Sequence, residues 1–134
     1  MFLFTLLLAI TSLTFCQAAT PTEVAALISF AESTNVEEAV GGGWNLLDTA
    51  NVCDWGGIWC SESGAITELN FNKTNAEGLK GSLPSSLKDL VNLKKLTIFE
   101  CDIVGEIPRE LGELSKLETL QLIYLNLVGE VSSL

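Results

Sequence analysis

The feature that most constrains this chain is an internal repeat: the sequence matches itself when it is shifted by 24 residues. A self-match in many columns at one period indicates a repeat architecture. The aligned columns are Gly81, Gly105 and Gly129; Pro84 and Pro108; Leu79, Ile103 and Leu127; Leu83, Ile107 and Val131; Leu87 and Leu111; Leu90 and Leu114; Leu93 and Leu117; Leu96 and Leu120; and Ile98 and Leu122. An earlier unit fits the same pattern if three additional residues lie between Phe71 and Leu79.

The apolar pattern of each repeat unit predicts a short strand, followed by a segment that leads the chain back through a shared core. In the segment Leu96-Thr97-Ile98 both apolar side chains point to one side, because side chains alternate along a strand. Ile103 and Ile107 turn the chain back through the core, and Leu111 and Leu114 form the apolar face of a short helical or 3₁₀ return. One unit buries little surface alone, so stacked units must share one continuous core, and the end of that core needs a cover.

The residues before the repeats predict a helical cap. Residues 20–23, Thr-Pro-Thr-Glu, are typical of a helix start, with a capping threonine, a proline at the first position and a glutamate that completes a capping box. We expect one apolar face on this helix, formed by Val24, Leu27, Ile28 and Ala31. A second short helical piece is expected over Val36 to Val40. Residues 44–63 are expected to form an irregular loop, and Ala65 to Phe71 alternate as a strand.

Cys53 and Cys60 enclose the segment CDWGGIWC, which precedes the first repeat. A zinc site needs four ligands, and the chain has no histidine. A redox pair usually has two intervening residues, whereas six separate these cysteines. In a secreted chain a disulfide is favoured, and an eight-residue loop closed in this way gains about 2–3 kcal/mol. We expect the disulfide to fix the loop over the first strand, with Trp55 and Trp59 supplying apolar cover.

The N-terminal segment 1–18 is predicted to be a secretory signal peptide. It is apolar from Phe2 to Phe15 apart from hydroxyl side chains, which is too short for a membrane span of about 20 residues. Cleavage is expected after Ala18 or Ala19, and an uncleaved signal anchor is the alternative. We expect a secreted, extracellular protein with no membrane span beyond this segment. Cys101 is then the odd cysteine, expected as a buried thiol, with an intermolecular disulfide as the alternative.

Composition argues against several classes of function. The formal charge of -10 makes nucleic acid an unfavourable partner, because phosphate contacts need clustered Lys and Arg. The absence of histidine excludes Ser-His and Cys-His nucleophile pairs, and no metal-ligand cluster or glycine-rich phosphate loop is found in the sequence. We therefore expect no catalytic residues, no metal and no cofactor. A structural wall protein would be expected to carry Pro-rich or Ser-rich tracts, which are also absent from the sequence.

The cap and the repeats together resemble the plant-type leucine-rich repeat family. The stretch from Glu23 through Trp44 to Cys60 is similar to the N-terminal capping domain of that family, and the segments LKGSLPSSLKDL, IVGEIPRELGEL and LVGEVSSL resemble its L-x-G-x-I-P signature. The resemblance implies an α/β fold, a right-handed leucine-rich repeat solenoid with short parallel strands on the concave face and a helical, disulfide-clasped cap. The implied organisation is a signal peptide (1–18), a cap (19–64) and about three repeats (65–134).

Family members are mostly secreted proteins or ectodomains of receptor-like kinases and receptor-like proteins. The resemblance implies an extracellular module that binds a peptide or protein ligand, with a co-receptor as a further partner. The alternative is a small secreted protein that inhibits wall-degrading hydrolases or acts as a co-receptor-like partner. The sequence stops inside the third repeat, where Ser132 replaces the signature proline. We expect a fragment or a truncated reading frame, and a complete small protein is the alternative.

The family places asparagine at the corner after each strand, where the side chain satisfies backbone groups. The matching positions are Thr74, Cys101 and Leu125. Threonine and cysteine each carry a donor and can partly substitute, whereas leucine cannot. We expect a less regular ladder, or a local shift that uses Asn126 instead.

Carried over residue by residue, the outward positions of each strand predict the ligand-binding surface. In the second and third units these are Lys94, Lys95, Thr97, Phe99, Glu100, Glu118, Thr119, Gln121, Ile123 and Tyr124; in the first unit they are Thr67, Glu68, Asn70, Asn72 and Lys73. Phe99, Ile123 and Tyr124 are large and apolar for a solvated face, which suggests a contact patch. The alternatives are that singly exposed apolar residues are common, or that Phe99 packs against a neighbour.

Asn72-Lys73-Thr74 is an N-glycosylation sequon, which a secreted chain would expose to modification. In this register Asn72 lies on the concave face, so a glycan would block the first unit as a ligand surface. The three-residue insertion beside it offers an alternative, in which Asn72 swings outward.

Overall fold

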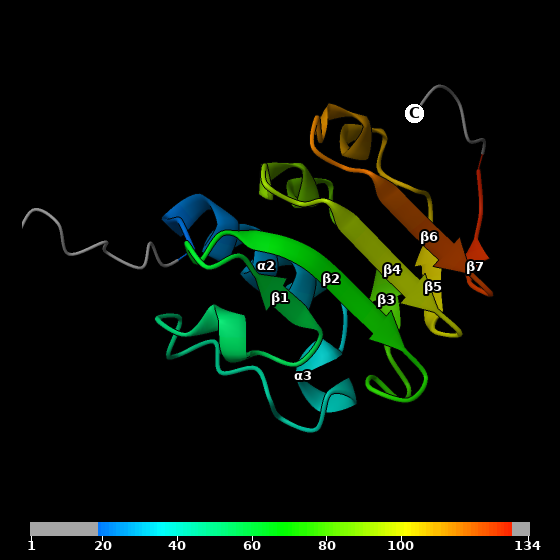
Figure 1. Cartoon of the computed structure of the whole chain (residues 1–134). Helices are drawn as coiled ribbons and strands as arrows, with labels where there is room; N and C mark the ends of the chain where they lie inside the picture. The colour runs from blue at the N-terminus through cyan, green and yellow to red at the C-terminus, as the bar shows by residue number, and fades with distance from the viewer. Residues whose placement is uncertain (1–18, 130–134) are drawn as a thin grey trace, which may run out of the picture.

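A computed structural model describes residues 19–129, and the predicted signal peptide and the end of the third repeat lie outside them. The chain forms a stack of turns with strands along one side, as Figure 1 shows. Its helices are α2 (Pro21–Ser33) and α3 (Val36–Ala39), and its 3₁₀ turns are η1 (Val52–Asp54), η2 (Ser85–Asp89) and η3 (Arg109–Glu113). The strands are β1 (Ile58–Cys60), β2 (Ile66–Asn72), β3 (Lys80–Ser82), β4 (Lys95–Phe99), β5 (Asp102–Gly105), β6 (Thr119–Ile123) and β7 (Asn126–Leu127).

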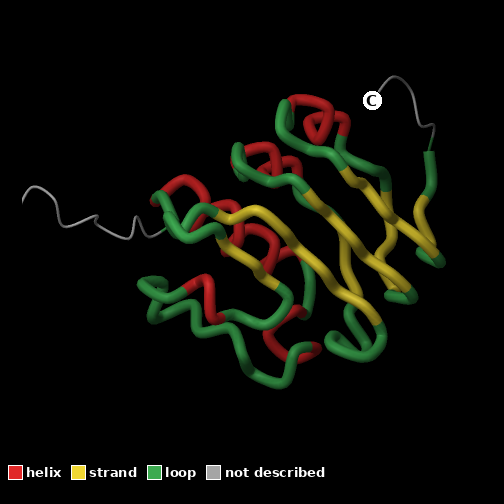
Figure 2. The backbone as a smooth tube through the Cα atoms, viewed as in Figure 1, coloured by secondary structure: helices red, strands yellow, loops and turns green. Residues whose placement is uncertain are grey.

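Two sheets run along the stack. The larger sheet has the order β1-β2-β4-β6, and the smaller one has the order β3-β5-β7 (Figure 2). Strands β2, β4 and β6 are parallel and in register, so that Leu69, Leu96 and Leu120 are aligned. The predicted α/β solenoid with parallel strands is therefore confirmed. The smaller sheet was not predicted, because its strands are short and contain Gly81 and Gly105.

The inward side chains of the repeats form the core, as the periodicity predicts. Leu96, Ile98 and Ile103 are fully buried. The predicted returns are the turns η2 and η3, which bury Leu87 and Leu111. Polar side chains also meet across neighbouring repeats at the same spacing of 24 residues: Lys116 Nζ donates to Asn92 Oδ1 at 2.6 Å, Thr97 Oγ1 to Gln121 Oε1 at 3.4 Å, and Asn126 Nδ2 to Asp102 Oδ1 at 2.8 Å.

Helix α2 begins with the predicted capping box. The Glu23 amide donates to Thr20 Oγ1 at 3.2 Å, and the Thr20 amide donates to Glu23 Oε2 at 2.8 Å. The predicted apolar face is confirmed for Leu27 and Ala31, and Val24 packs against the core while partly buried; Ile28 is only half-buried. The buried face consists of Glu23, Ala26, Leu27, Phe30 and Ala31. The helix is turned toward this face because the Phe30 ring stacks on Phe71 of β2, with centroids 5.3 Å apart.

The cap covers the first strand with aromatic side chains and a disulfide. Cys53 and Cys60 are bonded as predicted, with Cα atoms 5.7 Å apart. Trp44 and Trp55 are buried with ring centroids 4.8 Å apart, and Trp44 Nε1 donates to the Gly56 carbonyl at 2.8 Å. These contacts join the cap to the repeats as one core.

Two predictions for the cap loop are wrong. Residues 58–60, expected to be irregular, form strand β1, which pairs antiparallel with β2. Trp59, expected to cover the core, is 47% exposed. Ile58 lies opposite Leu69 and points inward, so the next side chain along the strand must point to the other face.

The residues that follow helix α2 contact the first repeat directly. Thr34 and Gly81 form an isolated β-bridge, and Asn35 links to β3 through its amide, which donates to the Lys80 carbonyl at 3.2 Å. Asn35 Nδ2 also donates to the Gly78 carbonyl at 3.1 Å. Gly81 has a φ of 124° and lies against the Ser33 carbonyl, so this contact depends on the missing side chain.

The corner ladder follows the prediction at Cys101, whose thiol donates to the Phe99 carbonyl at 3.4 Å, and differs from it at the other two corners. Asn75, not Thr74, caps the corner after β2: its Nδ2 donates to the Asn70 carbonyl at 2.9 Å, and its Oδ1 accepts from the Asn72 amide at 2.7 Å. The insertion in this unit moves the asparagine one residue along. Asn126 donates to the side chain of Asp102 instead of to a backbone group.

Candidate recognition surface

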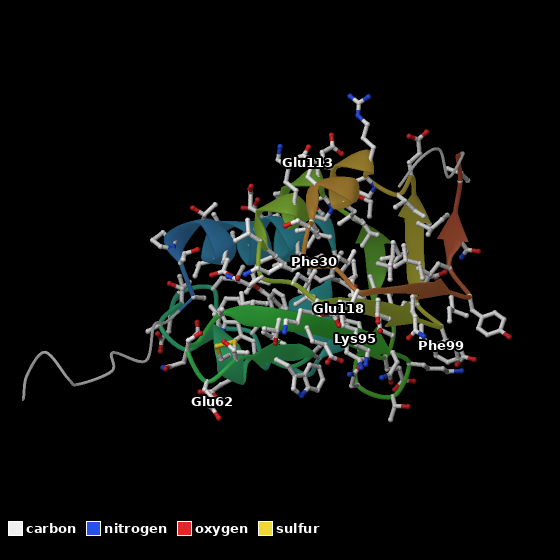
Figure 3. All side chains as sticks on the ribbon, turned by 45° about the horizontal axis from the view of Figure 1, so that its top comes forward. Phe30, Glu62, Lys95, Phe99, Glu113 and Glu118 are labelled. Atoms are coloured by element: carbon white, nitrogen blue, oxygen red, sulfur yellow. A yellow bond between two sulfur atoms is a disulfide. The ribbon has the colours of Figure 1, made fainter. Side chains whose placement is uncertain are left out.

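The outward side chains of the larger sheet form one surface, which we call the recognition face. The strand register arranges them in three rows across the sheet. The first row is Trp59, Glu68, Lys95 and Thr119; the middle row is Asn70, Thr97 and Gln121; the last row is Asn72, Phe99 and Ile123. Figure 3 labels Lys95 and Phe99 on this face and Phe30 in the interior. The rows exist because strands of equal phase stack in register.

The first row is a charged row with its charges compensated. Lys95 Nζ lies 3.1 Å from Glu68 Oε1, and the same oxygen accepts from Asn70 Nδ2 at 3.3 Å. The Lys95 side chain is 41% exposed, so this ion pair contributes at most about 1 kcal/mol of stability. The ion pair and the hydrogen bond together tie Glu68 to both of its neighbours on this face.

The middle row offers hydrogen-bonding groups without charge. Thr97 and Gln121 are joined through their side chains, and Asn70 is held by Glu68. Amides and hydroxyls both donate and accept, so this row can pair with the backbone of an extended ligand.

The last row borders a hollow of about 440 Å³ on the recognition face. Its lining residues are Asn70, Asn72, Lys73, Thr74, Thr97, Phe99, Glu100, Gln121 and Ile123. Phe99 is half-buried and meets the ring of Tyr124 edge-on, with centroids 5.6 Å apart. Ile123 is 39% exposed and Tyr124 is 75% exposed. Phe99, Ile123 and Tyr124 thus form one apolar cluster at the border of the hollow.

Glu100 and Tyr124 occupy the same position in consecutive repeats and share an unusual backbone. Their φ angles are 54° and 55°, in the left-handed region that side chains other than glycine rarely adopt. The Glu100 amide donates to the Ile123 carbonyl at 3.0 Å, which ties this corner to the next strand. The left-handed corners end the strands and turn Tyr124 outward.

The structure brings some of the predicted ligand-binding residues together and separates others. Thr97, Phe99, Glu100, Gln121 and Ile123 line the hollow. Tyr124 and Glu100 border a second depression of about 510 Å³ at the strand ends, together with Lys73, Asp102 and Asn126. Lys94 and Glu118 are exposed at the opposite ends of the strands, outside both depressions.

Trp59 is a member of this surface that the sequence analysis did not assign. Its place beside Glu68 follows from the antiparallel pairing of β1. The alternation Ile58-Trp59-Cys60, directly before a predicted strand, was the signal that could have found it.

Metal and thiol chemistry can be examined over the described residues 19–129. Among residues 19–129 there is no group of three or more His, Cys, Asp or Glu that could hold a metal ion. Cys101, at the corner after β4, is buried, and its thiol lies 3.4 Å from the Phe99 carbonyl. Burial raises the pKa of the Cys101 thiol, which disfavours the nucleophilic thiolate.

None of the helices within residues 19–129 has the length and apolar character that a membrane span requires.

Several solved structures that are similar to this chain are plant receptor ectodomains. Neither a protein-family model nor a curated protein sequence matches the chain. The BIR2 ectodomain from Arabidopsis thaliana matches with a TM-score of 0.67 and 26% identity, over 78% of this chain and 55% of that one. A chain of the BIR3–SERK2 complex from the same plant matches with a TM-score of 0.66 and 24% identity, over 78% and 57%.

A third match is the leucine-rich repeat ectodomain of the receptor kinase GASSHO1/SCHENGEN3 from Arabidopsis thaliana, in complex with CASPARIAN STRIP INTEGRITY FACTOR 2. Its TM-score is 0.62 and its identity 29%, over 81% of this chain and 13% of that one. The chain therefore spans little more than half of the BIR2 ectodomain and a small part of the GASSHO1/SCHENGEN3 ectodomain. With its parallel strands, N-terminal helix and disulfide, this chain has the leucine-rich repeat fold of plant receptor ectodomains.

Proposed function

We propose that this chain is an extracellular recognition module, the N-terminal part of a receptor-like protein or kinase, and that its recognition face binds an extended peptide segment. The observation that carries the proposal is the hollow, which has an apolar cluster at its border and a row of uncharged hydrogen-bonding side chains beside that cluster. An apolar anchor with a few polar groups beside it is typical of a ligand site.

Each of the three rows would have a separate role in binding the ligand. Phe99, Ile123 and Tyr124 would take an apolar side chain of the ligand, while the middle row would pair with its backbone amides. The Glu68–Lys95 pair leaves little net charge in the first row, so burial under a ligand would not strand a single charge. Two of the similar structures support a protein or peptide partner, since one is a complex of BIR3 with SERK2 and the other a complex of GASSHO1/SCHENGEN3 with CASPARIAN STRIP INTEGRITY FACTOR 2.

The test is a selection of random linear peptides on the full chain made without N-linked glycans, followed by affinity measurements on variants. Phe99→Ala is expected to weaken the selected peptides at least tenfold, which corresponds to about 1.4 kcal/mol. Val104→Ala is the matched control, because Val104 is equally apolar and 47% exposed but lies on β5 of the other sheet. Selected peptides that bind both variants as tightly as the native chain would place binding elsewhere.

The alternative function, inhibition of a wall-degrading hydrolase, would use a protein surface as the ligand. It is tested with a purified pectin-degrading enzyme whose rate is followed as the full chain is added. Inhibition that is lost in Phe99→Ala and kept in Val104→Ala would favour this alternative over a receptor for peptides.

A further inference from the structure

Asn72 of the sequon lies inside the recognition face. It is the last residue of β2, and its Cα is the register partner of Phe99, which in turn is aligned with Ile123. It also lines the hollow. The alternative in which the insertion swings Asn72 outward is therefore wrong, because the insertion begins after the strand has ended.

The Asn72 side chain is held in a defined orientation. Its Oδ1 accepts from the Thr74 amide at 2.8 Å and from the Asn75 amide at 3.2 Å. These bonds close an Asx-type turn and direct Oδ1 toward the corner. Nδ2 is on the opposite side of the planar amide, and in the described part of the chain it has no hydrogen-bond partner. The nitrogen that a glycan would modify thus faces away from the turn.

We propose that Asn72 carries an N-linked glycan whose first sugar lies over the hollow and covers Phe99, so that the glycan restricts the ligand surface. The inference rests on the extracellular location in the proposed function. The donor is a lipid-pyrophosphate-linked oligosaccharide. A bond forms between Nδ2 and C1 of the first sugar, the bond between C1 and the pyrophosphate oxygen breaks, Nδ2 loses a proton, and the lipid pyrophosphate leaves.

The position of Phe99 explains why the glycan would lie down on the sheet instead of extending into solvent. An aromatic ring offers an apolar surface to the C–H groups of a sugar, and the half-buried Phe99 is the nearest ring in the same row. Asn70 and Thr97 of the middle row also line the hollow and can donate to sugar hydroxyls. The covered area would leave two places open to a ligand: Trp59 in the first row and Tyr124 at the strand ends.

The experiment compares the native chain with Thr74→Ser, which keeps the sequon, and Thr74→Ala, which removes it while retaining Asn72. Thr74 is exposed, and only its backbone amide takes part in the turn, so neither change should unfold the protein. Urea midpoints verify this. The full chain is secreted from cultured eukaryotic cells behind a heterologous leader, so that the result does not depend on residues 1–18. Intact mass is measured before and after treatment with a peptide N-glycosidase.

The position of the glycan is measured by hydroxyl-radical footprinting. In the native chain and in Thr74→Ser we expect Phe99 to be oxidised severalfold more slowly than in Thr74→Ala, with Trp59 and Val104 unchanged as internal references. An unmodified native mass overturns the proposal, and so does a glycosylated protein in which Phe99 reacts at the rate seen in Thr74→Ala. The peptide selection, repeated on Thr74→Ala, decides the proposed function separately, since that variant has no glycan.

Discussion

The second and third repeats have the same pattern of inward apolar residues and a different degree of burial. In β4, Leu96 and Ile98 are fully buried, whereas their partners in β6, Leu120 and Leu122, are half-buried. Strand β4 lies between β2 and β6, while β6 has a neighbouring strand on one side within the described residues. The pattern of leucines defines which way a side chain points, but the neighbouring turn decides how much water it loses.

The other end of the stack shows how a cap replaces a neighbouring repeat. No repeat precedes β2, yet Leu69 and Phe71 are fully buried. β1 supplies the strand on that side, and Phe30 and Trp44 supply the apolar contact, with the Trp44 ring 6.2 Å from that of Phe71. The aromatic cluster and the disulfide-closed cap therefore keep the inward side chains of β2 away from water, as β2 does for those of β4.

The largest expected effect tests the difference in burial between the second and third repeats. Leu96→Ala should lower the free energy of unfolding by about 3–5 kcal/mol, because a fully buried leucine leaves a cavity in a packed layer. Leu120→Ala should cost clearly less, since part of its side chain is already in contact with water. Urea denaturation measures both values. Equal losses would show that the two repeats are buried alike in solution.

The contact between cap and first repeat is tested by Gly81→Ala. A Cβ at this position would meet the Ser33 carbonyl and the Thr34 backbone, and the φ of 124° is unfavourable for alanine. We expect a loss of about 2–4 kcal/mol from strain and overpacking together. Gly78→Ala is the control: its φ is 77°, but nothing lies within 4 Å of the added atom, so about 1 kcal/mol is expected. Thermal unfolding measures the loss of stability in each variant. Equal losses in Gly81→Ala and Gly78→Ala would contradict the close contact at Gly81.

The disulfide closes the loop of the cap beside β1. Replacing Cys53 and Cys60 together with serine should cost about 2–3 kcal/mol, mainly through the greater freedom of the unfolded loop. Hydrogen exchange distinguishes the regions: amides of β1 and β2 should lose protection before those of β4. A uniform loss over all strands would mean that cap and repeats unfold as one unit.

The smallest expected effect concerns Cys101 and pH. Burial raises the pKa of this thiol in the folded state, so its contribution to stability is complete below the ordinary thiol pKa of about 8.5. That contribution is lost as the pH rises from there toward the raised pKa of the folded state, because the unfolded chain releases the proton first. Urea midpoints of the native chain should fall relative to Cys101→Ala over this range. A constant difference would mean that the thiol titrates alike in both states.

The repeat architecture could be predicted from the sequence because its signal is redundant. The inward positions recur in every unit, and the structure buries Leu96, Ile98 and Leu111 as the period requires. The cap helix was predicted from its start, and its capping box is present, but its orientation depends on the stacking of Phe30 on Phe71, a contact 41 residues apart in sequence. Strand β1 and the strands of the smaller sheet have two to four residues each, which is too few for a periodic signal.

The recognition face was predictable as far as the repeats define it. Thr97, Phe99 and Gln121 lie where the alternation places them, and the role of any of them in binding remains a prediction. Trp59 was missed because the alternation in β1 covers only three residues, and pairing with β2 decides which face its side chain takes. The shift from Thr74 to Asn75 at the corner depends on how the inserted residues are accommodated, and periodicity carries no information about an insertion.

The three polar pairs that join the second and third repeats, each 24 residues apart in sequence, have a consequence for the rate of folding. Glu68 pairs with Lys95, 95 − 68 = 27 residues on, and Lys95 pairs with Thr119, 119 − 95 = 24 residues on, so the loop that each repeat closes does not lengthen along the array and its entropic cost does not grow. Once the cap and the first strand are together, each later turn can add to a finished template. Lengthening such an array would leave the separation of its contacts in sequence unchanged, and the time to add a turn should then be the same for the next turn as for the last.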